Sequence, residues 1–341
     1  MNAKEIFLKL VGSAEHLTEE EAAVLIEGVV RGEFAPVQVA ALLTALRVKG
    51  ETPEEIVGCI RTMRKHMLTL SAPGAVDLAG TGGDGAGTFN ISTAASFVVA
   101  GAGAGVAKHG NRAASSKCGS ADVLEALGVN IMLAPREAEA VFSKVGMVFL
   151  FAPIYHPAMK NIGPVRKELG FRTVFNFLGP FLNPAGTKRQ LIGVPDRASA
   201  EKLAVVAVKL GFEHILIVTS EDGMDEITTT AKTMAFEVKS TSMCTFMITP
   251  EEFGIALCKK DALLGGDAMT NAEIIRNILA GEKSPRRDIV VLNAAAALFV
   301  SGTVRTIAEG VTLAERSIDS GAAQKALTNL IAETTTYAQK T

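Results

Sequence analysis

From about residue 75 onward, short apolar runs alternate with longer stretches of helical spacing, and this pattern constrains the fold more than any other feature of the chain. Strands separated by helices of about ten to fifteen residues pair side by side in parallel, in a sheet that helices cover on both faces. The sequence therefore predicts an α/β fold with a mostly parallel central sheet. The expected strands are 76–79, 105–107, 147–151, 191–194 and 214–218, and the expected helices are 120–127, 135–145, 198–210, 272–279, 288–300 and 312–332.

The first 70 residues have a different texture, with helix signals and no strand-like alternation. Thr18 with Glu21 and Thr52 with Glu55 have the spacing of capping boxes, each of which begins a helix. Between them, Pro36 begins an apolar helix that we expect to end just before a glycine. This part of the chain is predicted to be a small all-helical unit.

The change of texture predicts two domains. We expect a helical domain over residues 1–71 and a larger α/β domain over residues 72–341. The segment of about 160–190 is rich in proline and glycine and helical in patches, so we expect it to pack with the helical domain.

Charge and hydropathy exclude several classes of function. With 34 basic and 36 acidic residues, the chain has no basic excess for a nucleic acid or an anionic membrane surface. The longest apolar stretch, 94–107, is too short to span a bilayer, and the first residues lack a signal-peptide core. The four cysteines are widely spaced, which favours reduced thiols. We expect a cytoplasmic protein with no nucleic-acid or membrane partner.

A glycine-rich loop, Gly80-Thr-Gly-Gly-Asp-Gly85, follows the first expected strand and leads into a helix. It matches the dinucleotide fingerprint, but the acidic residue expected about twenty positions later is missing, and no Gly-Lys-Ser/Thr follows to make a Walker A loop. The structural alternative is a tight turn with Ser92 as the cap of the next helix. Five glycines followed by polar side chains favour phosphate binding through backbone amides. Those side chains belong to Thr88, Asn90, Ser92 and Thr93.

Two further clusters follow expected strands. The segment 108–120 contains three cations and several hydroxyls before a helix begins at Ser120, which suits a second phosphate group. The turn Asp222-Gly-Met-Asp-Glu226 follows the last expected strand and offers carboxylates for Mg²⁺. The carboxyl ends of parallel strands meet at one edge of a sheet, so we expect all three clusters to lie together there.

Together with these clusters, three more motifs complete a pattern: Tyr155-His-Pro-Ala-Met159, Arg166 with Leu169-Gly-Phe-Arg-Thr173, and Phe175-Asn-Phe-Leu-Gly-Pro180 with Asn183-Pro184. In this order, the motifs resemble the nucleoside-phosphorylase-like phosphoribosyltransferases, and within that family the members of the tryptophan pathway that act on anthranilate. The resemblance covers most of the chain, including the helical unit. It implies transfer of the phosphoribosyl group of 5-phosphoribosyl 1-pyrophosphate to the amino group of anthranilate, with release of pyrophosphate.

The resemblance also implies roles for individual residues. Phosphoribosyl pyrophosphate is expected to contact Gly80, Gly83, Asp84, Thr88, Asn90, Ile91, Ser92, Thr93, Lys108, His109, Gly110, Asn111, Arg112, Ala113, Ala114, Ser115, Ser116 and Ser120. Anthranilate is expected to contact Gly80, Asn111 and Arg166, with His109 and His156 along its path. Ser92, Asp225 and Glu226 are expected to bind Mg²⁺, with two ions per active site.

No general base is expected, because an aromatic amine is already neutral at pH 7; Lys108 and Mg²⁺ are expected to stabilise the leaving group electrostatically. A homodimer through the helical domain is expected. Two alternatives share the fold: a pyrimidine-nucleoside phosphorylase and a non-catalytic nucleic-acid-binding relative. The chain departs from the family at Thr219-Ser220-Glu221, where a His-Gly is frequent before the acidic turn.

Overall fold

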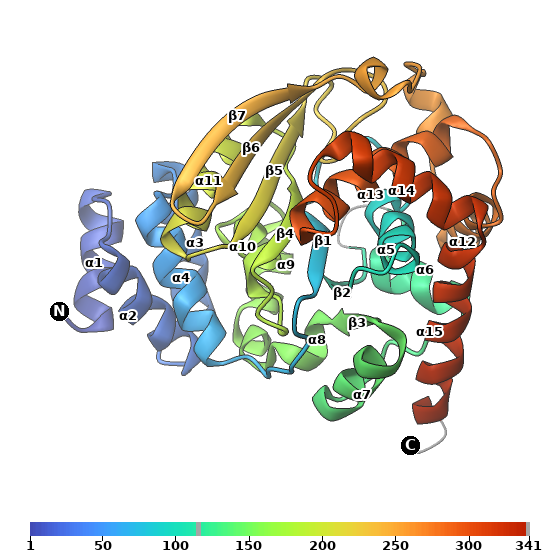
Figure 1. Ribbon diagram of the computed structural model, residues 1–341. Coiled ribbons are helices and arrows are strands. Elements are labelled where there is room, and N and C mark those ends of the chain that lie inside the picture. The colour runs from blue at the N-terminus through green and yellow to red at the C-terminus, as the bar shows by residue number, and fades with distance from the viewer. Residues whose placement is uncertain (114–116, 339–341) are drawn as a thin grey trace.

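The computed structural model describes residues 1–113 and 117–338, in which a seven-stranded sheet forms the centre of the molecule (Figure 1). The strands lie in the order β3-β2-β1-β4-β5-β6-β7. Strands β1 to β5 are parallel, so the predicted α/β fold with a mostly parallel sheet is confirmed. Their bounds are β1 Val76–Gly80, β2 Val106–Gly110, β3 Met147–Phe151, β4 Arg189–Gly193, β5 His214–Ser220, β6 Thr233–Lys239 and β7 Ser242–Ile248.

The hairpin of β6 and β7 is antiparallel and was not among the predicted strands. Its turn places Ser240 at φ 54°, and β7 is an edge strand whose residues are mostly exposed. The strand therefore lacks the alternation of buried and exposed residues by which a half-buried strand is recognised.

Helices cover both faces of the sheet. One face carries α5 and α13, with α14 and α15 packed against them, and the other carries α11, against which the N-terminal helix α4 packs (Figure 1). The expected helix over 312–332 is two helices, which break at Ser320 and Gly321. The bounds in the α/β part are α5 Ile91–Gly101, α6 Ser120–Leu127, α7 Pro135–Val145, α11 Arg197–Lys209, α12 Ala268–Leu279, α13 Pro285–Ser301, α14 Ile307–Asp319 and α15 Ala322–Ala338.

Successive strand residues face different cores. Leu191 and Leu216 belong to the core under α5 and α13, whereas their neighbours Ile192 and Ile215 belong to the core shared with α11 and the N-terminal helices. This follows from the two-residue period of a strand, because both faces of a parallel sheet are buried.

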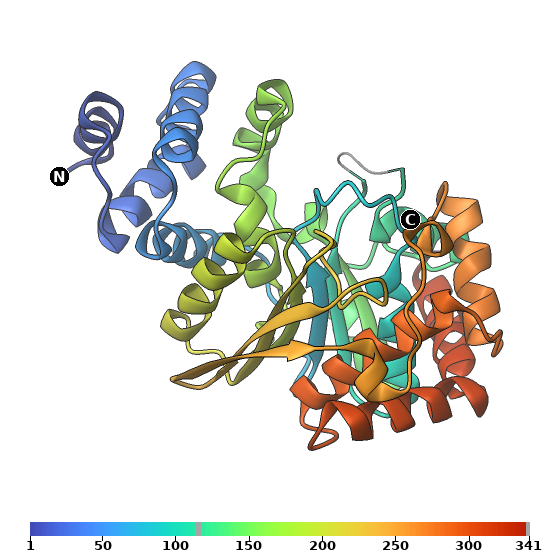
Figure 2. The same cartoon turned by 90° about the horizontal axis from the view of Figure 1, so that it is seen from above.

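The N-terminal helices form a unit to one side of the sheet (Figure 2). They are α1 Ala3–Ser13, α2 Glu19–Val30, α3 Pro36–Lys49 and α4 Pro53–Lys65, and the predicted capping boxes begin α2 and α4. The segment between β3 and β4 contributes Ile162, Val174 and Phe181 to the same core. Its short helices are α8 Ala152–Tyr155, α9 Gly163–Leu169 and α10 Phe175–Leu178.

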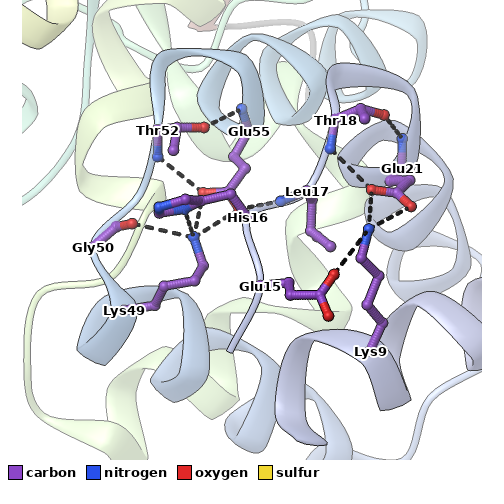
Figure 3. A network of polar contacts seen from close by, with 10 residues as sticks. All are labelled: Lys9, Glu15, His16, Leu17, Thr18, Glu21, Lys49, Gly50, Thr52 and Glu55. Atoms are coloured by element: carbon purple, nitrogen blue, oxygen red, sulfur yellow. Dashed lines mark hydrogen bonds and ion pairs between the residues drawn. The ribbon is translucent and has the colours of Figure 1, made fainter. Parts of the chain in front are cut away.

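A buried ion pair fastens the loops of this helical unit (Figure 3). Glu55, with no exposed side-chain surface, accepts hydrogen bonds from Lys49 Nζ at 2.7 and 2.8 Å. The same carboxylate accepts the backbone N–H groups of Leu17 and Thr52. One buried charge therefore satisfies donors before both α2 and α4, as a buried carboxylate must if its desolvation is to be offset.

The fold brings three sequence clusters to one edge of the sheet. Strands β1, β2 and β5 end at Gly80, Gly110 and Ser220, immediately before or within the glycine loop, the cationic segment and the acidic turn. After β3 the chain crosses to the other side of β1, so the edge between β1 and β4 is a topological switch point, where α/β sheets bind ligands. Within the described residues, no helix has the length and apolar character needed to cross a membrane.

Candidate active site

The glycine loop after β1 has a backbone that other residues rarely adopt. Gly82, Gly83, Gly85 and Gly87 have φ values between 64° and 79°, in the left-handed region that favours glycine. The Gly82 N–H donates to Asp225 Oδ2 at 2.7 Å, and a Cβ at Gly80 would meet the same carboxylate at 2.6 Å. The loop is therefore folded directly against the acidic turn.

A polar cavity of about 440 Å³ lies over this loop and the first turn of α5. All the described residues predicted to bind phosphoribosyl pyrophosphate line it; Ala114, Ser115 and Ser116 lie outside the described residues. Thr81 and Thr93 both line the cavity. Their Oγ1 atoms are buried and have no hydrogen-bond partner. Unsatisfied hydroxyls and the free amides of a helix N-terminus are the groups that an anion would satisfy.

The cavity contains a buried cation. Lys108 is 2% exposed, and its Nζ donates to Leu78 O at 2.6 Å and to Ser92 Oγ at 3.2 Å. Burial lowers the pKa of Lys108, while the carboxylates of Asp77 and Glu226 oppose that shift. The lysine is thus held by short contacts beside the same serine that was predicted to bind metal.

Three carboxylates gather at the acidic side of the cavity. Burial raises the pKa of Asp225 to about 7, and repulsion from Asp84 adds to the rise. Burial likewise raises the pKa of Glu226 to about 8, with repulsion from Asp225 as the next cause. A bound cation would stabilise the charged form of both carboxylates and lower both pKa values.

The oxygen donors at this side of the cavity could supply part of the ligand shell of Mg²⁺. Asp225, Glu226 and the Ser92 hydroxyl offer hard oxygen atoms in a cavity that also has room for a phosphate. Within the described residues, however, no group of three or more His, Cys, Asp or Glu side chains forms a complete metal site. Mg²⁺ commonly binds to one or two carboxylates and completes its shell with water and substrate phosphate.

Asp222, from the same turn, has a different role. Its Oδ2 accepts a hydrogen bond from Thr230 Oγ1, its Oδ1 accepts the Met224 N–H at 3.3 Å, and Lys260 Nζ lies 3.8 Å away. These contacts lower the pKa of Asp222 and shape the turn that carries the two other acids.

Two predicted phosphate contacts have side chains that are already bound within the protein. Asn90 donates to Cys118 O at 3.2 Å and accepts from Asn271 Nδ2 at 2.9 Å. Arg112 is paired with Asp122 and Glu125, which raise its pKa. In this state, neither side chain is free to bind a ligand.

A second cavity, of about 670 Å³, adjoins the first and is mostly lined by apolar groups from the 152–182 segment. His109 and Asn111 line both cavities, so the two are neighbours across these residues. Arg166 lines the second cavity, with its guanidinium 5.6 Å from the Phe175 ring centroid. Burial lowers the pKa of Arg166, and among the described residues no carboxylate lies within ion-pair distance of it. A half-buried arginine beside apolar groups suits a flat aromatic carboxylate.

The two predicted histidines contact each other at the border of the cavities. Their Nε2 atoms are 3.1 Å apart, and His109 Nδ1 lies 3.3 Å from Gly179 O. The carbonyl can accept only, so we assign the proton of neutral His109 to Nδ1, and His156 then donates its Nε2–H to His109 Nε2. Burial lowers the pKa of His109 to about 3 and that of His156 to about 4.

The structure also brings polar side chains from a distant segment to the site, which were not predicted as site residues. Arg172 and Asn176 line the polar cavity, although both come from the segment between β3 and β4. Both lie inside motifs quoted above, Arg172 directly before Thr173 and Asn176 directly after Phe175. The signal that could have identified them is their position close to Arg166 in a segment expected to approach the sheet edge.

Comparison with known proteins agrees with this geometry. Residues 4–67 match the glycosyl transferase family, helical bundle domain, and residues 72–324 match the glycosyl transferase family, a/b domain. The chain is 52% identical to anthranilate phosphoribosyltransferase of Rhodopseudomonas palustris (strain BisB5), over 97% of this chain and 98% of the relative.

Solved structures give the same result. The anthranilate phosphoribosyltransferase of Thermus thermophilus superposes with a TM-score of 0.92 at 40% identity, covering 98% of this chain and 100% of that one. The enzyme of Saccharomyces cerevisiae in complex with PRPP and Mg has a TM-score of 0.89 at 27% identity, covering 98% of each chain. The chain belongs to the anthranilate phosphoribosyltransferases, glycosyltransferases of tryptophan biosynthesis.

Proposed function

We propose that the polar cavity binds phosphoribosyl pyrophosphate and that the adjoining apolar cavity binds anthranilate, so that the two reactants meet at His109 and Asn111. The observation that carries this assignment is the pair of cavities with these two residues in common. The glycine loop, the start of α5 and Lys108 face one substrate, and Arg166 faces the other. In domain terms, residues 72–341 line both cavities, and the 152–182 segment, whose part from about residue 160 we group with helical residues 1–71, supplies most of the second.

The proposal assigns Mg²⁺ to Asp225, Glu226 and Ser92. A relative from Saccharomyces cerevisiae was solved with PRPP and Mg, which supports a metal in this half-site. One Mg²⁺ commonly uses one or two carboxylates, and three carboxylates, with Asp84 included, lie at this edge. The proposal therefore keeps two ions per active site.

The reaction needs charge stabilisation more than proton transfer. The anthranilate nitrogen donates its lone pair to ribose C1 while the bond from C1 to the pyrophosphate oxygen breaks, and the electron pair leaves with pyrophosphate. The ribose gains oxocarbenium character, as in glycosyl transfer generally. Lys108 and the loop amides stabilise the departing oxygens, and Arg166 holds the amine in line through the anthranilate carboxylate. Bound Mg²⁺ would neutralise the leaving pyrophosphate.

The histidine pair fits this scheme without a general base. In the tautomers assigned above, the acceptor lone pair of His109 Nε2 is already used by His156. The ring contact, with centroids 5.0 Å apart, instead shapes the border between the half-sites. The C–N bond leaves the nitrogen as a secondary ammonium, which then loses one proton to water and becomes the secondary amine of the product.

The proposal also covers the localisation and oligomeric state of the protein and the two alternative functions. We expect a cytoplasmic homodimer that pairs through the helical unit, where Leu8, Val37 and Val48 are exposed apolar side chains. Arg166 beside Asn111, which suits a carboxylate, and the pair Asp225 and Glu226 favour the transferase over a pyrimidine-nucleoside phosphorylase, and relatives at about half identity carry the transferase name. A nucleic-acid-binding role has no support from a net charge of -2.

The decisive test is an assay of anthranilate fluorescence. Mixing the protein with anthranilate, phosphoribosyl pyrophosphate and Mg²⁺ should remove the fluorescence of the free amine, and EDTA should stop the loss. The chain has no tryptophan, so background emission is low. Phosphate-dependent cleavage of uridine or thymidine without any loss of anthranilate would favour the phosphorylase, and a shift of random DNA on a gel would favour the binding protein.

A further inference from the structure

We propose that Arg172 is a positioning residue that holds the glycine loop in the shape needed for phosphoribosyl pyrophosphate. This inference deepens the proposed function and rests on it. Arg172 lies between α9 and α10, six positions after Arg166, and reaches from that segment to the sheet edge. It donates hydrogen bonds from Nη1 to Gly82 O and from Nη2 to Thr81 O, the latter at 3.5 Å.

These contacts determine how the loop peptides face. In a planar trans peptide, the C=O and the N–H point in opposite directions. The Thr81–Gly82 peptide has Arg172 on its carbonyl side and Asp225 Oδ2, 2.7 Å away, on its N–H side. In the next peptide, Arg172 binds the Gly82 carbonyl, so the Gly83 N–H is turned away from the arginine.

The glycine loop loses much backbone entropy when it is held in one conformation. Gly82 and Gly83 both have positive φ, and glycine loses more backbone freedom than any other residue when it is fixed. A Cβ on Gly83 would collide with Arg172 Nη1, so the guanidinium lies directly on the loop backbone. A loop fixed in advance costs less entropy when it binds an anion.

Arg172 differs from the other cations of the cavity in its binding partners. Among the described lining residues, Lys108, Arg112 and Arg172 carry positive charge. Arg112 is paired with two carboxylates, and Lys108 is bound to a carbonyl and a serine. In the part of the chain that the structure describes, no carboxylate lies within 4 Å of Arg172, although its charge opposes the rise in the pKa of Asp225.

One segment therefore places two arginines at the two half-sites. Arg166 donates to Asn176 Oδ1 at 3.4 Å, and the same oxygen accepts the Thr173 N–H at 2.9 Å. Asn176 thus fixes the turn from which Arg172 extends. We expect Arg166 to determine anthranilate affinity and Arg172 to determine phosphoribosyl pyrophosphate affinity.

Calorimetry on four variants of the full-length protein tests this division. Arg172→Ala should raise the Kd for Mg²⁺–phosphoribosyl pyrophosphate about 10- to 100-fold, as expected for loss of charged hydrogen bonds, and leave anthranilate affinity within about twofold. Arg172→Lys should fall between Ala and wild type, because a single ammonium cannot bind both carbonyls as a fork. Lys167→Ala, an exposed cation on α9, is the matched control and should change neither, and Arg166→Ala should show the reverse pattern.

Several outcomes overturn the proposal. Phosphoribosyl pyrophosphate affinity within about twofold of wild type in Arg172→Ala would do so. A fall in Tm of more than about 8 °C with equal weakening of both substrates would assign Arg172 a purely structural role. A wild-type protein that binds no phosphoribosyl pyrophosphate would instead refute the proposed function, so the two failures can be told apart.

Discussion

Replacing Glu226 with glutamine should make the metal-free protein more stable in alkaline solution while it removes magnesium-dependent binding. In the unliganded structure, burial and the neighbouring Asp225 raise the pKa of Glu226 to about 8, from an ordinary 4.5. Between these values, the folded protein keeps a proton that the unfolded chain has lost. Stability is therefore lost as pH rises through this window and is lowest above pH 8. Glutamine does not titrate and escapes the loss.

The size of the effect follows from the shift. About three and a half pKa units correspond to at most about 5 kcal/mol. Glu226 and Asp225 repel each other, so the shift belongs to both, and the open cavity admits water. About 2 kcal/mol is therefore the realistic gain for Glu226→Gln at pH 8.5, with almost none near pH 5. A bound Mg²⁺ would remove this repulsion between the two carboxylates.

Urea unfolding in EDTA at pH 5 and pH 8.5 measures the difference. Glu221→Gln is the matched control, because Glu221 is an exposed carboxylate of the same turn and should change stability little at either pH. Adding phosphoribosyl pyrophosphate and Mg²⁺ should raise the Tm of the wild type and leave that of Glu226→Gln nearly unchanged. An equal stability difference at both pH values would show that titration of Glu226 is not the cause, and the reasoning would fail.

Other contacts described above give three further predictions. Arg166→Ala should weaken anthranilate binding by about 1.5–3 kcal/mol in calorimetry, with much less effect on phosphoribosyl pyrophosphate; the opposite result would mean that the half-sites are exchanged. His109→Ala and His156→Ala should lower turnover modestly, without the ~10²–10⁴-fold loss of a general base. Since their pKa values are near 3 and 4, the wild-type rate profile should lack an acidic limb at pH 6–7, and a limb that either variant abolishes would reveal a base. Glu55→Gln should destabilise the protein by about 3–5 kcal/mol in urea unfolding, and Lys49→Met added to it should recover part of the loss.

The parallel part of the sheet could be predicted because its strands are buried on both faces and stand out as apolar runs. Strand β5, His214–Ser220, is buried throughout, whereas β7 is mostly exposed. An edge strand makes its hydrogen bonds with one neighbour and packs few side chains, so its residues are under weak constraint. The hairpin was missed for this reason. Its absence from the prediction did not affect the site, which lies at the ends of β1, β2 and β5.

The candidate site could be predicted where its residues come directly after a strand in the sequence. Every described residue assigned to phosphoribosyl pyrophosphate lines one cavity, because the carboxyl ends of β1 and β2 are neighbours. Side-chain direction was not predictable. Asn90 is held by Cys118 and Asn271, and Arg112 by acids of α6, contacts that no local pattern specifies. Arg172 was missed because its partners are 90 and 91 residues away in the sequence.

In the proposed assignment, the charges that line the two cavities also direct the two anionic substrates to different half-sites. Arg166 has no carboxylate within ion-pair distance among the described residues, whereas Asp84, Asp225 and Glu226 crowd the other cavity. In the proposed assignment, the carboxylate of anthranilate is attracted to Arg166, and above about pH 8, where Asp225 and Glu226 are charged, those acids repel it from the other cavity. Phosphoribosyl pyrophosphate faces the same repulsion at that pH unless Mg²⁺ accompanies it, so we expect the acidic turn to make metal a condition of its binding. At pH 8.5 without Mg²⁺, we thus expect anthranilate to keep its affinity for the protein while phosphoribosyl pyrophosphate loses most of its own. Calorimetry with each substrate in EDTA measures both, and equal metal dependence of the two affinities would contradict this account.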